Sequence, residues 1–251
     1  MQHPILIALL AGLIGIVLGA LGTGGGILAL PVLLYVAELP LREAVAVSQV
    51  VIALSSLFGT LLQGQRANLA WRHILCYGLA GVPLAKLGNY LGNRLEGDWQ
   101  MVLFGALVGV AGYRILRGSA ATEAGHWNLP LAILSGAGIG FLTGLLGVGG
   151  GFLLVPVLIS AGGLAVKLAA ATSLPIIALN AGMGAWDNRA VWQAHASLVG
   201  LFLGSTLVGT YVGIAAAHRL SEQVMRKGVG WALVVVGIFE IIVNAMKWIG
   251  R

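Results

Sequence analysis

The chain has 251 residues, of which 59% are hydrophobic and 9% charged, and its formal net charge is +6. Such an apolar composition indicates an integral membrane protein. The 14 basic residues are scattered singly, which argues against a nucleic-acid partner and fits anchoring at the surface of a lipid bilayer. The single cysteine, Cys76, excludes an internal disulfide and a multi-cysteine metal site, and we predict no metal and no cofactor.

Nearly uncharged runs of the length of a membrane-spanning helix recur along the chain, so we predict an all-α polytopic membrane protein. The first half contains four such segments, at residues 4–35, 44–62, 74–91 and 99–116. The first is too long for one straight span. It contains Gly22, Thr23, Gly24, Gly25 and Gly26, with Pro31 behind them. Because glycine disfavours helix, we predict a helix, a break and a half-helix here.

The second half repeats this pattern after a polar linker at residues 118–128. Its segments lie at residues 129–159, 166–186, 194–217 and 224–248, and its glycine run is Gly147, Gly149, Gly150 and Gly151. Gly19 and Gly144, Pro31 and Pro156, and Ser48 and Ser173 are each 125 positions apart, which indicates a duplication. We therefore predict one membrane domain, residues 1–251. It has about eight segments in two repeats, 1–117 and 129–251, and segments one and five are broken at the glycine runs.

The orientation of the repeats depends on whether segments one and five cross the membrane or turn back. If they turn back, the repeats are inverted and the basic residues divide eight against five. If they cross, the repeats are parallel and the division is about seven to six. The charge bias favours the inverted arrangement, with the eight-charge side in the cytoplasm. That side would hold Arg66, Arg72, Arg114, Arg117, Lys167, Arg219, Arg226 and Lys227.

The glycine runs are the main candidate binding site. Unwound backbone inside a bilayer is tolerated only where protein or a polar cavity satisfies it. The helix N-termini that follow, at Ile27 and Phe152, would present N–H groups and partial positive charge to an anion. The alternative is that these glycines only allow close helix packing.

Polar residues within the predicted spans are further candidates for binding an anion, with interhelical hydrogen bonding as the alternative. They are Ser48, Gln49, Thr172, Ser173 and Asn180. Lys86 is a second-rank candidate, since an intramembrane charge needs a cavity, a partner or a path to the interface. Glu240 suggests proton coupling, or a pair with Lys247. The coupling ion, H⁺ or Na⁺, stays open. His73 and His195 lie at loop edges and favour interface anchoring over proton handling.

Three motifs together resemble the sulfite exporter TauE/SafE family of membrane permeases. They are the doubled Gly-x-Gly-Gly-Gly with a trailing Pro-Val-Leu, the Arg-Ala-Asn-Leu-Ala-Trp-Arg loop, and Gly-Asn-Tyr-Leu-Gly in segment three. The resemblance covers nearly the whole chain. It implies a permease of a bacterial or archaeal cytoplasmic membrane for sulfur-containing anions such as sulfite, sulfoacetate or organosulfonates. By position it supports both glycine runs together with Pro31 and Pro156, although Thr23 in the first run corresponds to Val148 in the second.

We therefore expect a secondary transporter of small sulfur-containing anions, whose partners are that anion and the lipid bilayer. The alternatives are an anion channel and, less favoured, an intramembrane enzyme. The sequence lacks a Gly-x-Ser-x-Gly elbow, a His-Glu-x-x-His zinc helix and a pair of close intramembrane carboxylates, so we expect no enzymatic activity. Assembly as a homo-oligomer stays open.

Overall fold

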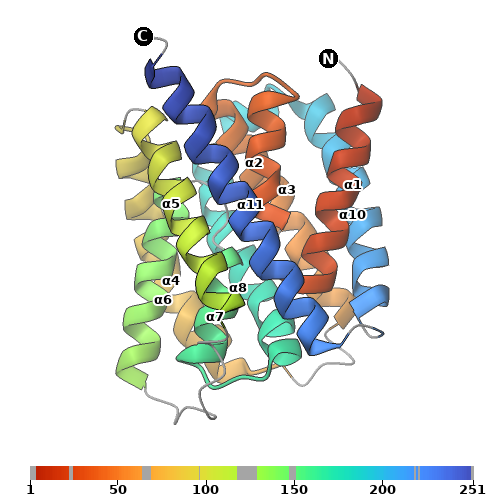
Figure 1. Ribbon diagram of the computed structural model, residues 1–251, viewed down its shortest axis with the longest axis vertical. Coiled ribbons are helices and arrows are strands. Elements are labelled where there is room, and N and C mark those ends of the chain that lie inside the picture. The colour runs from red at the N-terminus through yellow and green to blue at the C-terminus, as the bar shows by residue number, and fades with distance from the viewer. Residues whose placement is uncertain are drawn as a thin grey trace.

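The computed structural model describes residues 4–22, 25–63, 69–95, 97–117, 129–146, 151–217, 219 and 221–249, and within these residues it contains helices and no strand (Figure 1). The helices in chain order are α1 (Pro4–Leu21), α2 (Gly25–Tyr35), α3 (Leu41–Gln63), α4 (Trp71–Gly92), α5 (Gly97–Leu116), α6 (Leu129–Leu146), α7 (Gly151–Ser160), α8 (Val166–Asp187), α9 (Arg189–Gln193), α10 (Ala196–Ala217) and α11 (Glu222–Ile249).

Helix length separates membrane-spanning from shorter elements. Among the described residues, α1, α3, α5, α6, α8 and α10 are long and apolar enough to cross a bilayer. α4 has 22 residues, and α11 has 28 with an apolar stretch at Gly230–Asn244. α2 and α7 have only 11 and 10 residues, so each covers about 16 Å or less at 1.5 Å per residue. The chain is thus a multi-pass membrane protein that also contains two half-length helices.

The two half-length helices turn back toward the end of the bundle from which they came. Figure 1 shows α1 descending from the N-terminus and α2 returning to that end, while α6 rises from the opposite end and α7 returns to it. The interruption predicted in the first segment is confirmed, because α1 ends at Leu21 and α2 begins at Gly25. α6 ends at Leu146 and α7 begins at Gly151, so most of the second glycine run, residues 147–150, lies outside the described residues.

Helices from the first half of the chain pack against helices from the second half. α3 contacts α8 near the centre, α5 contacts α11, α1 contacts α10, and α4 contacts α6. Glycines permit the closest approaches. A Cβ at Gly19 would overlap the carbonyl oxygen of Thr210, and one at Gly144 would overlap that of Ala85. Small residues therefore join α1 to α10 and α6 to α4, as is typical of helices packed in lipid.

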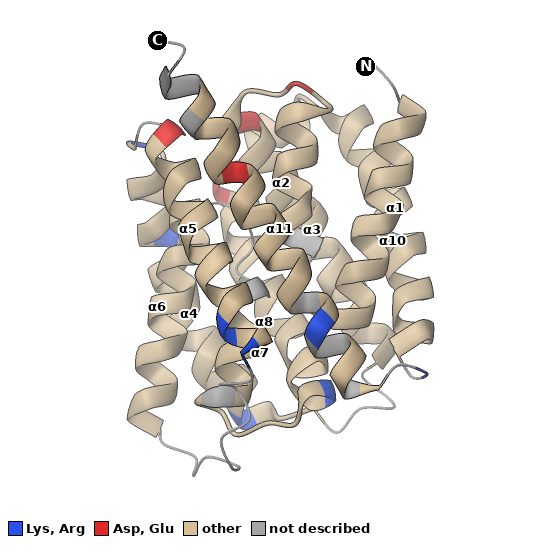
Figure 2. Cartoon of the chain, in the orientation of Figure 1, with Lys and Arg blue, Asp and Glu red and all other residues tan. Residues whose placement is uncertain are grey.

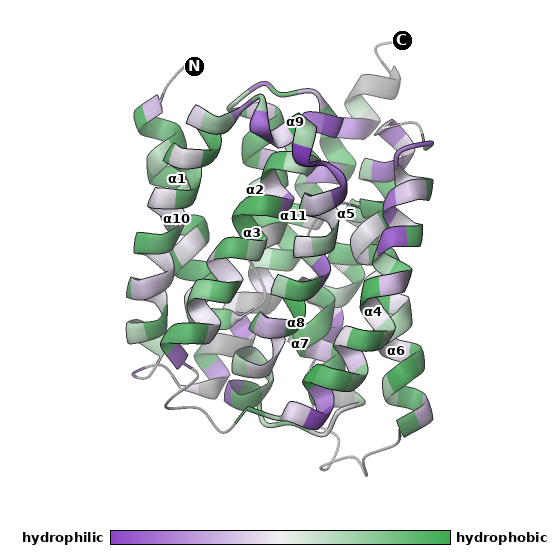
Figure 3. Cartoon of the chain, turned by 180° about the vertical axis from the view of Figure 1, so that it is seen from behind, coloured by the Kyte–Doolittle hydropathy of each residue, from purple (hydrophilic) through white to green (hydrophobic). Residues whose placement is uncertain are grey.

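The outer surface is apolar in its middle and polar at its ends (Figure 3). Large apolar side chains point outward, among them Leu9, Leu61, Leu79, Val208 and Val235. Figure 2 shows the acidic residues in the half of the molecule that holds both termini and most basic residues in the other half. We call these two ends the acidic end and the basic end.

One predicted segment boundary is wrong in a way that affects the site. Trp71, Arg72 and His73 were expected in a loop, yet they form the first turn of α4. The helix begins there because the carbonyl of Ala70 accepts hydrogen bonds from the backbone N–H groups of His73 and Ile74. His73 is consequently 9% exposed, and its Nε2 lies 2.9 Å from the carbonyl oxygen of Gly162, which it binds as a donor. It joins α4 to the turn after α7.

Candidate functional site

The first glycine break is fastened to α8. Gly22 follows α1 with a φ of +65°, in the left-handed region that favours glycine, and a Cβ there would overlap the carbonyl oxygen of Ala170. The Ser173 hydroxyl lies 2.7 Å from the carbonyl oxygens of both Gly22 and Ala170, so it has one proton for two acceptors. Ser173 therefore holds the unwound backbone in place, which is the interhelical hydrogen bonding that the sequence analysis gave as the alternative to anion binding.

The half-helix N-termini lie inside the bundle, next to the breaks. α2 begins with Gly25 and Gly26, and α7 begins with Gly151. Figure 1 shows both starting points within the molecule rather than at its ends. The other predicted glycine-run residues, Thr23, Gly24, Gly147, Gly149 and Gly150, lie outside the described residues. A helix N-terminus at such a depth brings unpaired N–H groups and partial positive charge into the membrane interior.

Ser48 and Thr172 are fully buried and bind backbone groups. The Ser48 hydroxyl donates to the carbonyl of Val45 at 2.9 Å, just as Ser173 bonds to a carbonyl three residues earlier in its own helix. Thr172 Oγ1 accepts a hydrogen bond from the backbone N–H of Ala70 at 3.3 Å. Ser48 in α3 and Ser173 in α8 thus make the same bond to the carbonyl three residues earlier.

Gln49 belongs to a buried amide network that joins α3, α4 and the α8–α9 junction. Asn188 Nδ2 donates to Gln49 Oε1 at 3.1 Å and to the Gly184 carbonyl at 3.1 Å, and it lies 3.5 Å from Asn89 Oδ1. Gly184 makes room for the network, since a Cβ there would collide with the Gln49 amide. Sequence reasoning missed Asn188 and Asn89. Asn89 had a signal, because it lies within the Gly-Asn-Tyr-Leu-Gly motif, but nothing local connected it to Gln49.

A pocket of about 210 Å³ with both polar and apolar residues in its lining opens beside this network, at the acidic end of the bundle. At roughly 30 Å³ per water it has room for a small anion and a few waters. The end of α6 contributes Leu145, whose carbonyl accepts a 2.6 Å hydrogen bond from Gln100 Nε2. The pocket therefore reaches the backbone that leads into the second glycine run. Its lining is Leu41, Arg42, Val45, Asn89, Gly92, Asn93, Leu95, Gly97, Gln100, Gly144 and Leu145.

Arg42 supplies the positive charge of this pocket, and sequence reasoning did not select it. The residue is exposed in the first turn of α3, where the chain enters the membrane. The pocket lining contains Arg42 together with Asn89, Asn93 and Gln100. Amide N–H groups and a guanidinium fork are suitable donors for an oxyanion.

The remaining candidates, Asn180 and Lys86, lie apart from the pocket lining. Asn180 is 2% exposed, lies against Gly81 of α4, and its Oδ1 has no hydrogen-bond partner in the part of the chain that the structure describes. Lys86 is exposed on α4 next to exposed Leu87. Its position on the outer surface favours the alternative in which the ammonium reaches the membrane interface.

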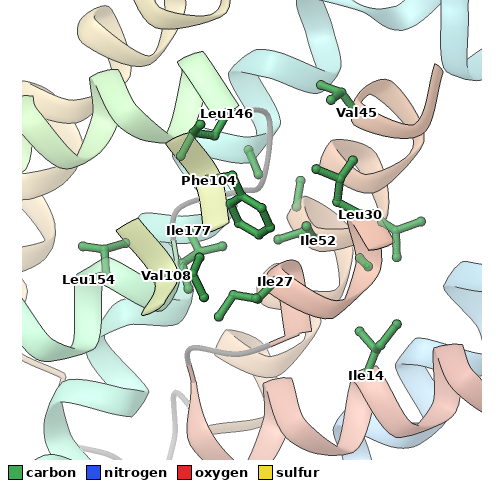
Figure 4. Close-up of a cluster of buried hydrophobic side chains, with 14 of the residues drawn as sticks. Ile14, Ile27, Leu30, Val45, Ile52, Phe104, Val108, Leu146, Leu154 and Ile177 are labelled. Atoms are coloured by element: carbon green, nitrogen blue, oxygen red, sulfur yellow. The ribbon is translucent and has the colours of Figure 1, made fainter. Parts of the chain in front are cut away.

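Apolar side chains fill the space between the two half-helices. Figure 4 shows Phe104 and Val108 of α5 directed toward Ile27 of α2, with Leu154 of α7 and Ile177 of α8 beside them. All five are at most 2% exposed. We call these five residues the central apolar cluster. A polar ion cannot pass through it without rearrangement, because the ion would lose its water without gaining hydrogen bonds.

Comparisons with known proteins agree on the kind of protein this chain resembles. The family model described as Sulfite exporter TauE/SafE matches residues 7–239. A probable membrane transporter protein of Xylella fastidiosa is 32% identical, over 92% of this chain and 92% of the relative. Probable membrane transporter proteins of Methanocaldococcus jannaschii and Bacillus subtilis are 29% and 24% identical. These matches cover 70% and 94% of this chain, and 68% and 98% of the relatives.

Proposed function

Because the chain belongs to the sulfite exporter TauE/SafE family, we propose that it is a secondary transporter that moves small sulfur-containing anions across the cytoplasmic membrane. The substrate class is sulfite, sulfoacetate or a similar organosulfonate. The observation that carries the proposal is the pocket at the end of α6, whose lining includes Arg42 and three residues with amide side chains, next to the backbone entering the second glycine run.

The proposed binding chemistry uses few charges. In the pocket, Arg42 attracts the anion, and the amides of Asn89 and Gln100 take over part of its hydration. Deeper in the membrane, the N–H groups at the start of α2 and α7 complete the coordination. Each hydrogen bond to a charged group contributes about 1.5–3 kcal/mol against a large desolvation cost, so affinity in the micromolar to millimolar range is expected.

The proposed architecture is a pair of inverted repeats. The packing supports it, since α1 contacts α10 in the same way that its counterpart α6 contacts α4, and counterparts also meet in the α3–α8 and α5–α11 pairs. The opposite directions of the α1–α2 and α6–α7 turns are those expected of inverted halves. Alternating access then follows from small movements of α2 and α7 that open and close the central apolar cluster.

A flux panel tests the proposal directly. The purified protein would be reconstituted in liposomes, and uptake of sulfite, sulfate, thiosulfate, taurine and sulfoacetate would be measured with and without a pH gradient. We expect saturable uptake of sulfite or a sulfonate, and exchange of external for internal substrate. A steady anion conductance without saturation or exchange indicates a channel instead, and no flux of any of the five anions contradicts the proposal.

A further inference from the structure

A carboxylic acid lies in the apolar stretch of α11, outside the lining of the proposed anion pocket. Glu240 belongs to the apolar stretch Gly230–Asn244 and has 0% of its side chain exposed. Its Oε2 accepts a hydrogen bond from the Tyr35 hydroxyl at 3.1 Å and lies 3.3 Å from the Asn244 amide nitrogen, a second donor. Ionisable groups at such positions are costly, which makes Glu240 a candidate functional group.

Tyr35 connects this carboxyl group to the proposed transport path. It is the last residue of α2, whose first residues, Gly25 and Gly26, adjoin the first break. Its ring also packs edge-to-face against Phe239, with centroids 5.5 Å apart. The 11 residues from Gly25 to Tyr35 form one short helix. A change at Glu240 therefore acts on the C-terminal end of α2, and the proposed anion contact lies at its N-terminal end.

The helices packed against α11 bring few other ionisable groups to this position. α1 has no charged residue, and Tyr35 is the ionisable residue of α2. α5 faces Glu240 with Gly105, where a Cβ would lie 3.1 Å from Glu240 Cβ, and its charged residues Asp98 and Arg114 lie in its first and last turns. α8 has Lys167 and Asp187 near its two ends. The other charged residues of α11 lie toward its ends, and they are Glu222, Arg226, Lys227 and Lys247.

We propose that Glu240 is the proton-binding site through which this protein couples anion transport to a pH gradient. The inference rests on the transport function proposed above. One proton from solution adds to the carboxylate and yields a neutral carboxylic acid, and release to the opposite side restores the carboxylate. The hydrogen bond from Tyr35 is charge-assisted in the ionised form and weaker in the neutral form, so protonation loosens the end of α2 and biases its movement.

The test compares Glu240→Gln with the wild type in two assays on the same proteoliposomes. The first is anion accumulation driven by a pH difference, and the second is exchange of labelled for unlabelled anion at equal pH. For one proton per anion, a pH difference of one unit supports an accumulation ratio of at most about tenfold. We expect Glu240→Gln to reduce that ratio to about one and to keep exchange, because glutamine retains the shape and an oxygen acceptor but does not titrate.

The control is Glu38→Gln, which removes an exposed carboxylate three residues beyond Tyr35 and should leave both assays unchanged. A wild-type accumulation ratio in Glu240→Gln overturns the proton site while the transport proposal stands. Loss of both accumulation and exchange in a folded Glu240→Gln protein also overturns it, since that result means a structural role. Absence of flux in the wild type contradicts the proposed function instead.

A second variant covers the case in which Glu240→Gln does not reach the membrane. Tyr35→Phe keeps the carboxyl group and removes the hydroxyl that donates to it. The ionised carboxylate loses a stronger hydrogen bond than the neutral carboxylic acid does. The pH midpoint of accumulation should therefore move to higher pH while exchange persists. An unchanged pH profile in this variant overturns the proposal.

Discussion

Gly22 meets two demands at one backbone position. Its φ of +65° disfavours any residue with a side chain, and the Ala170 carbonyl occupies the space that a Cβ would need. The Ser173 hydroxyl then fixes the carbonyl of Gly22 at 2.7 Å. This glycine is therefore required by its conformation and its contacts, whether or not an anion ever approaches it.

Replacing Gly22 by alanine should destabilise the protein and strongly reduce transport. The left-handed conformation costs about 1–2 kcal/mol for a non-glycine residue, and the overlap with α8 adds to that. Thermal unfolding in detergent and flux in liposomes measure the two effects. Gly138→Ala is the matched control, because a Cβ at that position meets nothing within 4 Å. Equal behaviour of the two variants would show that the break tolerates a side chain.

Arg42→Gln should weaken anion uptake without abolishing it. Arg42 belongs to the pocket lining but is exposed, so solvent screens its charge, and we expect KM to rise by about three- to tenfold. Lys86→Met removes a cation from the outer face of α4 and should change KM little. The initial rate of sulfite or sulfonate uptake measures both variants. A larger rise in KM for Lys86→Met than for Arg42→Gln would show that Lys86, and not Arg42, binds the anion.

At the scale of the elements, the central apolar cluster separates the starts of the two half-helices. Phe104 is fully buried and lies on α5, whereas Ile27 and Leu154 come from α2 and α7 (Figure 4). Movement of α2 would therefore change the packing around Phe104, which is directed toward Ile27. The cluster provides a hydrophobic barrier that the proposed transport cycle has to open and reseal.

Phe104→Ala should make that barrier leaky. Truncating a buried phenylalanine typically costs about 3–5 kcal/mol and leaves a cavity, so we expect lower thermal stability together with anion leakage that does not saturate. Passive efflux from preloaded liposomes detects the leak. Leu103→Ala, at a partly exposed neighbouring position on α5, should show neither effect. If Phe104→Ala liposomes do not leak and their uptake still saturates, other residues form the barrier.

The sequence predicted the helices better than it predicted the contacts between them. Runs of apolar residues predicted the spans, and four glycines in five positions predicted the break after α1, because both signals are local. Gln49, Asn89 and Asn188 are buried together, yet they come from three separate segments. No local pattern specifies such a meeting. His73 was misplaced for a related reason, since its partner, the carbonyl of Gly162, lies 89 positions away.

At the scale of the whole molecule, charge is distributed unequally between the two ends. Glu38, Glu43, Asp98 and Asp187 lie at the acidic end, where α2 and α8 finish and α3 and α5 begin. Arg72, Arg114, Arg117, Lys167, Arg219 and Lys227 lie at helix ends or in adjoining turns of the basic end. Positively charged residues are retained on the cytoplasmic side of membrane proteins. We therefore propose that the basic end faces the cytoplasm.

This orientation predicts that both termini face away from the cytoplasm. In a Cys76→Ala background, Glu38→Cys should react with a membrane-impermeant maleimide in intact cells. Arg117→Cys should react only after the membrane is permeabilised. Gel-shift labelling measures both sites, and each serves as the control for the other. The reverse labelling pattern would invert the orientation.

The pairing of α1 with α10 also determines when the protein can finish folding. α1 ends at Leu21 and its partner begins at Ala196, so 174 residues are synthesised between them. At roughly 5–20 residues per second, the ribosome needs on the order of ten to thirty seconds to deliver the partner. During that time α1 lies in the lipid without α10, and the glycines that pack against α10 are not covered. Maturation is consequently a late event, and a chain cut short before α10 lacks the partner that α1 requires.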